Sequence, residues 1–92
     1  MRLDKFLKVS RLIKRRTLAK EVSDQGRIEI NGKEAKASST VKVGDELTLR
    51  LGPRRITVKI ERIQETTRKE EAAEMYTILK EERVGYSEEQ ND

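Results

Sequence analysis

RLDKFLKVSRLIKRRTLAKEVSDQGRIEING, the stretch from residue 2 to residue 32, holds most of the signals that decide the fold. Its first part carries Leu3, Phe6 and Leu7 at the i, i+3, i+4 spacing of one helix face, with charged residues on the other faces. We expect these three side chains to lie in the core under a short amphipathic helix. Phe6 is assigned to packing and not to base stacking, because it shares a face with leucines.

A second helix is predicted to begin at residues 14–17, Lys-Arg-Arg-Thr, and to end at Gly26. Glycine readily adopts the left-handed conformation that often follows the last turn of a helix. Leu18, Ala19 and Val22 have the spacing of an apolar face, and we expect all three to pack on the core.

A hairpin follows the second helix. Residues 27–30 alternate between polar and apolar types, which is typical of a half-buried strand. Asn31-Gly32 is the strongest short signal for a hairpin turn, so residues 33–35 are predicted to return beside the first strand.

Two longer strands are predicted after a polar loop over residues 36–40. Val43-Gly44-Asp45 reads as a turn before a strand over residues 46–51, whose leucines face one way. A second turn at Gly52-Pro53-Arg54 leads to a last strand over residues 55–63, which points Ile56, Val58 and Ile60 inward.

The C-terminal part is predicted to be helical. Residues 67–70, Thr-Arg-Lys-Glu, match a capping box, and residues 70–82 carry apolar side chains at helical spacing. The last stretch, GYSEEQND, is expected to be disordered.

These patterns predict an α+β fold: two N-terminal helices packed on a small, mainly antiparallel sheet, plus a C-terminal helix. With 92 residues, 34% of them hydrophobic, the chain has room for one small core. The expected divisions are residues 1–63 for the main domain, 64–84 for a helix that packs on it or extends from it, and 85–92 for an acidic tail.

Positive charge is concentrated near the N-terminus. Residues 2–28 hold nine basic side chains against three acidic ones, whereas the whole chain has a net charge of +4. A concentrated basic surface is typical of proteins that bind nucleic acids. The candidate RNA-binding residues are Arg2, Lys5, Lys8, Arg11, Lys14, Arg15, Arg16, Lys20 and Arg27.

Asp4 is an acidic residue within this basic segment. Its carboxylate either stabilises the N-terminal end of the first helix or holds a neighbouring arginine in place, and the sequence leaves both roles open.

Three consecutive cations stand at the start of the second helix. The helix dipole disfavours positive charge there, by about 0.3–1 kcal/mol for each residue. An anion such as phosphate bound at this helix start would relieve the conflict, and a solvated run of charge is the alternative. Arg54 and Arg55 likewise either contact phosphate or keep an edge hairpin soluble.

The chain contains no histidine and no cysteine. It therefore lacks the usual general base at neutral pH, the thiolate metal ligand, and the Ser-His and Cys-His arrangements of nucleophilic catalysis. We expect no enzymatic activity, no cofactor and no metal site. The N-terminus MRLDKFLK is too charged for a signal peptide, and no apolar run has membrane-spanning length, so a cytoplasmic protein without membrane contact is expected.

Structured RNA is the favoured partner class. Three aromatic residues are too few for a platform that stacks single-stranded bases, whereas two rigid helices that present arginines suit the backbone of a folded RNA. A helix-turn-helix DNA binder is disfavoured because the second helix offers few side chains that read base edges. A module that binds only proteins would not need the clustered cations.

The order of these features resembles the S-four RNA-binding domain, the module of small-subunit ribosomal protein four, pseudouridine synthases and a bacterial tyrosyl-tRNA synthetase. The matching segments are RLDKFL (residues 2–7), KRRTLA (14–19), GRI (26–28), Asn31-Gly32 and VGDEL (43–47). The layout is most similar to the bacterial group of the fifteen-kilodalton heat-shock protein and its short members, the ribosome quality control P-site tRNA stabilising factors. Longer relatives carry a basic C-terminal extension, whereas this sequence ends acidic.

The resemblance implies binding to the rRNA of a free large ribosomal subunit that is obstructed by peptidyl-tRNA. It also implies that the factor stabilises this tRNA in the P site while a partner factor adds alanine to the stalled nascent chain. We expect a monomer. The alternative is a general structured-RNA or rRNA binder in ribosome assembly or recycling, and a DNA-binding or protein-interaction module is disfavoured.

Overall fold

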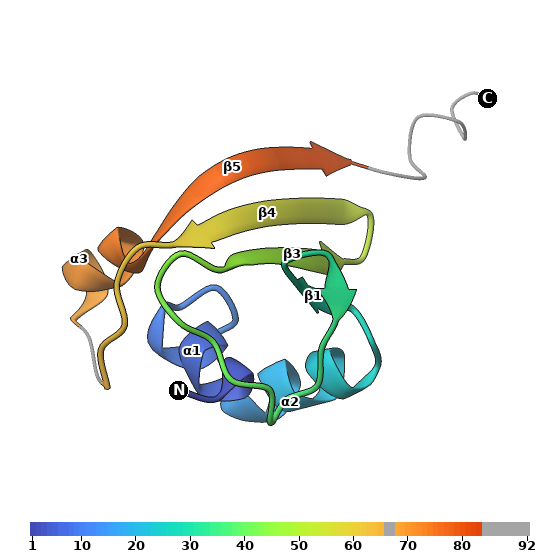
Figure 1. The fold of residues 1–92 in the computed structure, drawn as a ribbon, viewed down its shortest axis with the longest axis horizontal. Helices are drawn as coiled ribbons and strands as arrows, with labels where there is room; N and C mark the ends of the chain where they lie inside the picture. The colour runs from blue at the N-terminus through green and yellow to red at the C-terminus, as the bar shows by residue number, and fades with distance from the viewer. Residues whose placement is uncertain (66–67, 84–92) are drawn as a thin grey trace.

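Five strands form one antiparallel sheet in the computed structural model, which describes residues 1–65 and 68–83 (Figure 1). Along the sheet the order is β2-β1-β3-β4-β5. The strand bounds are Ile28–Ile30 for β1, Lys33–Glu34 for β2, Glu46–Leu51 for β3, Arg54–Ile60 for β4 and Tyr76–Arg83 for β5.

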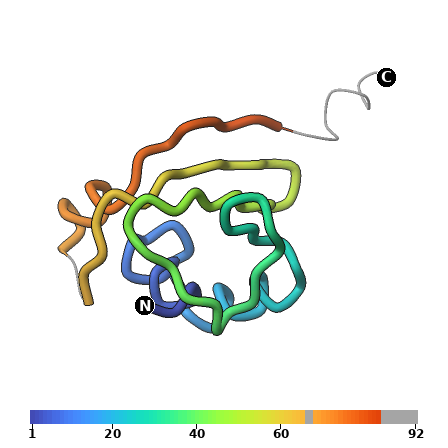
Figure 2. Tube along the Cα trace, in the orientation of Figure 1, coloured from blue at the N-terminus to red at the C-terminus, as the bar shows by residue number. Residues whose placement is uncertain are grey.

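The helices fall into two groups. α1 (Leu3–Val9) and α2 (Arg16–Asp24) pack together and lie below β3 in Figure 1, whereas β5 lies at the top of the view. The short α3 (Lys69–Ala72) and a 3-10 helix (Ala73–Met75) precede β5. The tube in Figure 2 shows that this C-terminal turn comes to the same end of the molecule as α1. The predicted α+β arrangement of two N-terminal helices on an antiparallel sheet is confirmed.

The core lies between the two N-terminal helices and the sheet. Leu3, Phe6 and Leu7 are fully buried, as their spacing predicts, and so are Leu47 and Leu49 of β3. The inward residues predicted for β4 are buried as well. One face of the central strands and one face of α1 therefore form a single apolar cluster.

The loop after β2 fixes the start of α1. No side chain caps this helix, and backbone carbonyls of the loop take that role. The N–H of Leu3 donates to the carbonyl of Ser39 at 2.7 Å, and the N–H of Asp4 donates to that of Ala37 at 3.2 Å. The first N–H groups of a helix need such acceptors, so the predicted polar loop serves as the cap of α1.

The two predicted turns are joined to one another. Asn31 and Gly32 have φ values of +53° and +85°, as a tight β1–β2 hairpin turn requires. The Asn31 side chain donates to Asp45 Oδ1 at 3.1 Å and accepts from the N–H of Glu46 at 2.9 Å. Burial raises the pKa of Asp45, but the hydrogen bonds from Asn31 and the Lys42 backbone outweigh it and leave the pKa below its usual range. The Asn-Gly and Val-Gly-Asp signals therefore form one structural unit.

The prediction that Leu18 packs on the core is wrong. Its side chain is 47% exposed, and the buried residues of α2 are Ala19 and Ser23. The Ser23 hydroxyl donates to the carbonyl of Ala19 at 2.7 Å, which lets a polar residue face the core. Small side chains on this face let α2 pack closely on α1, and Leu18, the neighbour of Ala19 in the sequence, lies on the exposed side of the helix.

The predicted C-terminal helix over residues 70–82 is also wrong. Helical structure extends only from Lys69 to Met75, and β5 follows directly and pairs with β4, so β4 is not the last strand. The Tyr76-Thr77-Ile78 run has high strand propensity, and β4 offers an open edge that needs backbone partners. The helix starts at Lys69, with the Glu71 carboxylate accepting from the Arg68 N–H at 3.3 Å. Thr67 and the predicted tail lie outside the described residues, and the proposed domain divisions stay predictions.

Two leucine truncations test this description of the core. Leu7→Ala is expected to lower the free energy of unfolding by about 2–5 kcal/mol, because Leu7 is fully buried. Leu18→Ala removes the same atoms from an exposed side chain, and its cost is expected to stay below about 1 kcal/mol. Urea unfolding followed by circular dichroism measures both. Equal losses in the two variants would place Leu18 in the core.

Candidate nucleic-acid interface

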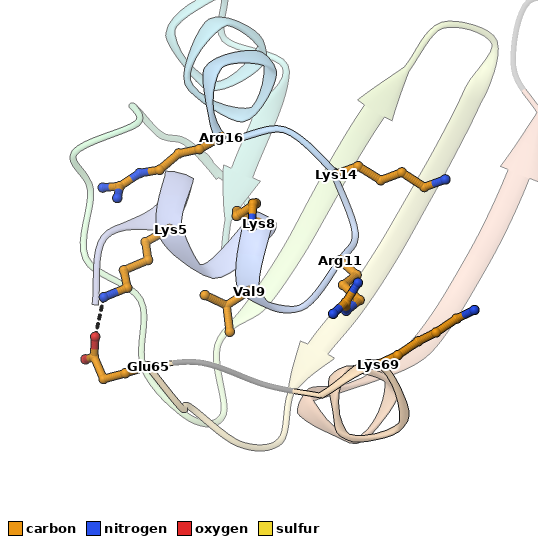
Figure 3. Close-up of a pocket in the computed structure, with 8 residues that line it drawn as sticks. All are labelled: Lys5, Lys8, Val9, Arg11, Lys14, Arg16, Glu65 and Lys69. Atoms are coloured by element: carbon orange, nitrogen blue, oxygen red, sulfur yellow. Dashed lines mark hydrogen bonds and ion pairs between the residues drawn. The ribbon is translucent and has the colours of Figure 1, made fainter.

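One cleft gathers cationic side chains from three parts of the chain (Figure 3). It encloses about 790 Å³ between α1, the α1–α2 connection and α3. The lining residues are Lys5, Lys8 and Val9 of α1, Arg11 and Lys14 of the connection, Arg16 of α2, and Glu65 and Lys69 of the C-terminal part. Six of these eight side chains are cationic and one is acidic, so the cleft is suited to a polyanion.

The α1–α2 connection bends sharply to bring its cations to the cleft. The N–H of Ile13 donates to the carbonyl of Leu7 at 3.1 Å, and the N–H of Arg11 donates to that of Lys8 at 3.1 Å. Arg11 itself has a φ of +65°. A left-handed conformation costs a non-glycine residue about 1–2 kcal/mol. The chain thus keeps a cation at a position where glycine would be more stable.

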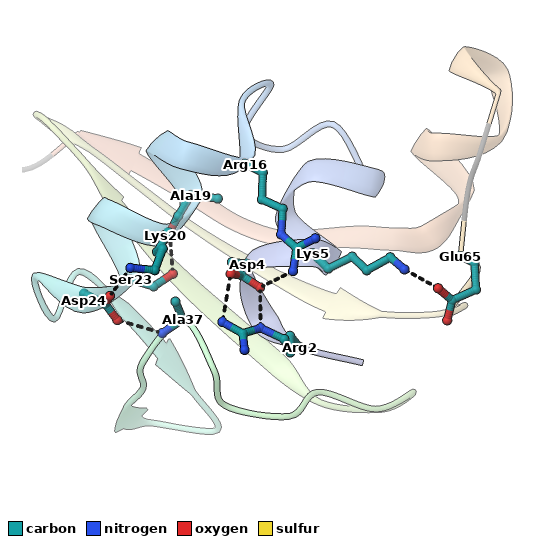
Figure 4. A network of polar contacts seen from close by, with 10 residues as sticks. All are labelled: Arg2, Asp4, Lys5, Arg16, Ala19, Lys20, Ser23, Asp24, Ala37 and Glu65. Atoms are coloured by element: carbon teal, nitrogen blue, oxygen red, sulfur yellow. Dashed lines mark hydrogen bonds and ion pairs between the residues drawn. The ribbon is translucent and has the colours of Figure 1, made fainter.

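Asp4 holds two arginines beside the cleft (Figure 4). Its carboxylate accepts from Arg2 Nε at 3.1 Å and Nη2 at 3.2 Å, and from Arg16 Nη2 at 3.5 Å. The Asp4 side chain is only 3% exposed, whereas each arginine side chain is 50% exposed. Of the two roles left open by the sequence, the structure shows the orientation of arginines, and Asp4 also lies in the first turn of α1.

The pKa of Asp4 reflects this arrangement. Burial raises the pKa of the carboxyl, but the hydrogen bond from Arg2 and the positive charges of Arg16 and Arg2 outweigh burial and hold the pKa below its usual range. The ionised carboxylate therefore stabilises the folded state at neutral pH, and this contribution is lost as the pH falls through the lowered pKa.

The remaining predicted residues do not line the cleft. Lys20 pairs with Asp24 at 3.8 Å, one turn along α2, and Arg27 follows the end of that helix. Arg15 borders a separate apolar groove of about 370 Å³ that Leu18 and Leu51 help to line. The structure brings together Lys5, Lys8, Arg11, Lys14 and Arg16, and Arg2 joins them through Asp4.

Glu65 and Lys69 were not among the predicted site residues. Lys5 Nζ and the Glu65 carboxylate form an ion pair between residues 60 positions apart in the sequence. No local pattern marks either residue, because only the course of the chain after β4 brings Glu65 and Lys69 to the cleft beside α1.

Comparison with known proteins places this geometry in a family. The family model of the S4 domain matches residues 1–47. An RQC P-site tRNA stabilizing factor of Bacillus subtilis (strain 168) is 73% identical over 85 residues, which cover 92% of this chain and 99% of that protein. The chain belongs to the S4-domain family, in the group of the RQC P-site tRNA stabilizing factors. RQC denotes ribosome quality control.

More distant members of the S4-domain family share the fold. Heat shock protein 15 of Escherichia coli (strain K12) is 40% identical over 77 residues, which cover 83% of this chain and 58% of that protein. The trimeric structure of Vibrio cholerae heat shock protein 15 superposes with a TM-score of 0.79 at 38% identity, over 85% of this chain and 80% of that one. The predicted resemblance is confirmed. The S4 match covers α1, α2 and the hairpin, and it ends before Glu65 and Lys69.

The described residues lack two features, a membrane-spanning helix and a cluster of metal-binding side chains. None of their helices is long and apolar enough to cross a membrane. Within residues 1–65 and 68–83, no group of three or more His, Cys, Asp or Glu side chains could hold a metal ion.

Asp4→Asn tests the role of the buried carboxylate. At pH 7 the variant is expected to be less stable than the parent by about 1–3 kcal/mol, because it loses charged hydrogen bonds to Arg2 and Arg16. The difference should shrink as the pH falls below about 4, where the unfolded chain takes up the proton, and it should disappear once the pH passes the lowered pKa of the folded protein. Urea unfolding at pH 7 and pH 3 measures both effects. A difference that does not depend on pH would contradict the role of the charge.

Arg11→Gly separates stability from binding at one position. Glycine should raise the free energy of unfolding by about 1 kcal/mol, because it adopts the observed φ without strain. The same substitution should weaken binding to RNA, because it removes a cation from the cleft. Arg11→Lys is the control, since it keeps both the charge and the strain. The expectation fails if Arg11→Gly leaves the affinity unchanged in filter binding to ribosomal RNA.

Proposed function

We propose that this chain is a non-catalytic RNA-binding factor of bacterial ribosome quality control. In this proposal it binds the rRNA of a large ribosomal subunit obstructed by peptidyl-tRNA, and it stabilises that tRNA in the P site while another factor adds alanine to the stalled chain. The observation that carries the proposal is the cleft of six cations in a chain 73% identical to an RQC P-site tRNA stabilizing factor. A factor of this kind works in the cytoplasm, where ribosomes are.

The charges of the cleft favour the RNA backbone as the ligand. When a lysine or arginine contacts a phosphate, counterions condensed on the RNA are released into the solvent. This release favours binding, so the affinity for RNA rises with the number of clustered cations. Phe6 is fully buried and Tyr76 is half-buried, so neither offers an exposed ring face for base stacking. Side chains fixed on helices match the regular spacing of phosphates in folded RNA better than the variable path of a single strand.

The site consists of two adjoining parts, which supports a role as a clamp. The cleft is one part, the Arg2–Asp4–Arg16 cluster is the other, and Arg16 belongs to both. Two RNA elements, such as an rRNA helix and a bound tRNA, can therefore be contacted at once. Binding of each element would then raise the affinity for the other by the same factor.

Co-sedimentation tests the proposed target. The tagged chain is expected to sediment with free large subunits and not with intact ribosomes, and more strongly when peptidyl-tRNA occupies the subunit than when it is empty. Equal affinity for empty and occupied subunits would leave a general rRNA binder. The proposed monomer is tested by sedimentation of the free chain, since the related heat shock protein 15 structure is trimeric.

Arg16→Ala tests the shared residue of the clamp. The variant is expected to bind occupied large subunits at least about tenfold less tightly, as for loss of a charged contact worth more than ~1.4 kcal/mol. Its fold should remain intact, because half of the Arg16 side chain is exposed. Arg50→Ala is a matched control: its side chain is 49% exposed and pairs with Glu29 on the sheet. Similar losses in both variants would show that total charge, not the clamp, determines binding.

Alanine tailing gives the cellular form of this test. Stalled nascent chains should lack alanine tails in cells that carry Arg16→Ala and should keep them with Arg50→Ala. Normal tailing with Arg16→Ala would remove this residue from the proposed mechanism.

A further inference from the structure

The cleft contains an anion supplied by the protein itself. Glu65 is the one acidic residue among the eight that line it, and its carboxylate pairs with Lys5 (Figure 3). The Glu65 side chain is 77% exposed, whereas that of Lys5 is 34% exposed. The carboxylate side chain of this ion pair is therefore more open to solvent than the lysine side chain.

Glu65 differs from the other acidic residue near the cations. The Asp4 carboxylate is almost completely buried and is held by two arginines, so an approaching anion cannot take its place. Among the described residues, Glu65 forms a hydrogen bond with Lys5, interacts more weakly with the positive charge of the N-terminus, and faces solvent. Exposed ion pairs of this kind contribute little to stability, because water and salt screen them. Asp4 is suited to orient cations, and Glu65 is suited to be displaced.

A phosphate group offers Lys5 the same chemistry as the Glu65 carboxylate. Both are oxyanions that accept hydrogen bonds from an ammonium group. A phosphate of RNA has the further advantage that its neutralisation releases counterions. Lys69, which follows Glu65 in the sequence and begins α3, contributes a further cation to the same cleft.

We propose that Glu65 occupies the place of an RNA phosphate in the free protein, that RNA displaces it from Lys5, and that Lys69 is a further phosphate ligand. This inference rests on the proposed RNA-binding function and extends the site beyond the S4 match, onto the C-terminal part of the chain. The exchange lowers the affinity for short RNA, which offers few phosphates to compete with Glu65 for Lys5.

Charge-neutral substitutions test the exchange. Binding to purified large subunits that carry peptidyl-tRNA is measured by sedimentation at several KCl concentrations. Glu65→Gln should bind about fivefold more tightly than the parent, the ratio for removing one exposed unit charge about 4 Å from another. Glu74→Gln is the control, because Glu74 is 60% exposed and pairs with Arg62 outside the cleft. It should change the affinity by less than about twofold.

A double-mutant cycle separates competition for Lys5 from a general charge effect. In the background of Lys5→Ala, Glu65→Gln should bring little further gain, because the lysine for which RNA and Glu65 compete is absent. Lys69→Gln should weaken binding and reduce the salt dependence, whereas Lys80→Gln on β5, a lysine 68% exposed, should do neither.

The ion pair is measured in the free protein by NMR. Hydrogen bonding and the positive charge of Lys5 hold the pKa of Glu65 below its usual range. Lys5→Ala should return that pKa toward the ordinary value. An unchanged Glu65 pKa would overturn the inference, because the pair would then be absent in solution.

The outcomes distinguish the inference from the function on which it rests. If the parent fails to bind occupied large subunits, the proposed function is wrong and the inference falls with it. If the parent binds and Glu65→Gln behaves like Glu74→Gln, the function stands and the exchange is wrong. Weaker binding of Glu65→Gln would also overturn the exchange and would make Glu65 a positioning residue for Lys5.

Discussion

The carboxylate of Asp4 is the interaction on which the arrangement of the basic surface depends. Its backbone N–H donates to the loop that caps α1, while its side chain accepts from Arg2 and from Arg16 at the start of α2. One residue thereby joins the N-terminus, both helices and the capping loop. Without a buried anion, two arginines would repel one another and lose their fixed directions. The directions of Arg2 and Arg16 at the surface are thus set by a carboxylate that is buried with the core.

Local signals in the sequence predict most of the domain. The α1 stripe, the end of α2 at Gly26 and the Asn31-Gly32 hairpin each depend on residues within a few positions of one another, and the structure confirms all three. Five of the nine predicted cations meet in the cleft for the same reason, since all five lie within the continuous segment of residues 5–16.

The errors arise where distant pairing outweighs local preference. Residues 70–82 have helical spacing, yet the open edge of β4 converts Tyr76–Arg83 into a strand. Leu18 has the spacing of a core residue, yet the approach of α2 through Ala19 turns it outward. Glu65 lies 60 positions after Lys5, and the two residues come together only once β3 and β4 have paired in the sheet. Local sequence patterns describe one helix or strand at a time, so they do not predict contacts between residues far apart in the chain.

The conflicts between local stability and charge fall on the proposed RNA site. Arg11 holds a left-handed conformation, and α2 begins with Arg16 and has no acidic residue in its first turn. Each feature lowers the stability of the free protein slightly. A bound phosphate would offset the positive charge at the start of α2 and would contact the cation that Arg11 places in the cleft. Local rules are broken where the cations converge, which is the pattern expected when a surface is shaped by its ligand.

The S4 match ends within β3, but the site does not. Leu47 and Leu49 are fully buried and lie opposite Val58 and Ile56 of β4, and Met75 beyond α3 is fully buried as well. The carbonyl of Met75 accepts the N–H groups of Glu61 and Arg62, which fixes the segment that carries Glu65. The C-terminal part therefore completes the core and the cleft together. A change that loosened β5 at the edge of the sheet would therefore reach the basic surface through Met75 and the segment that carries Glu65.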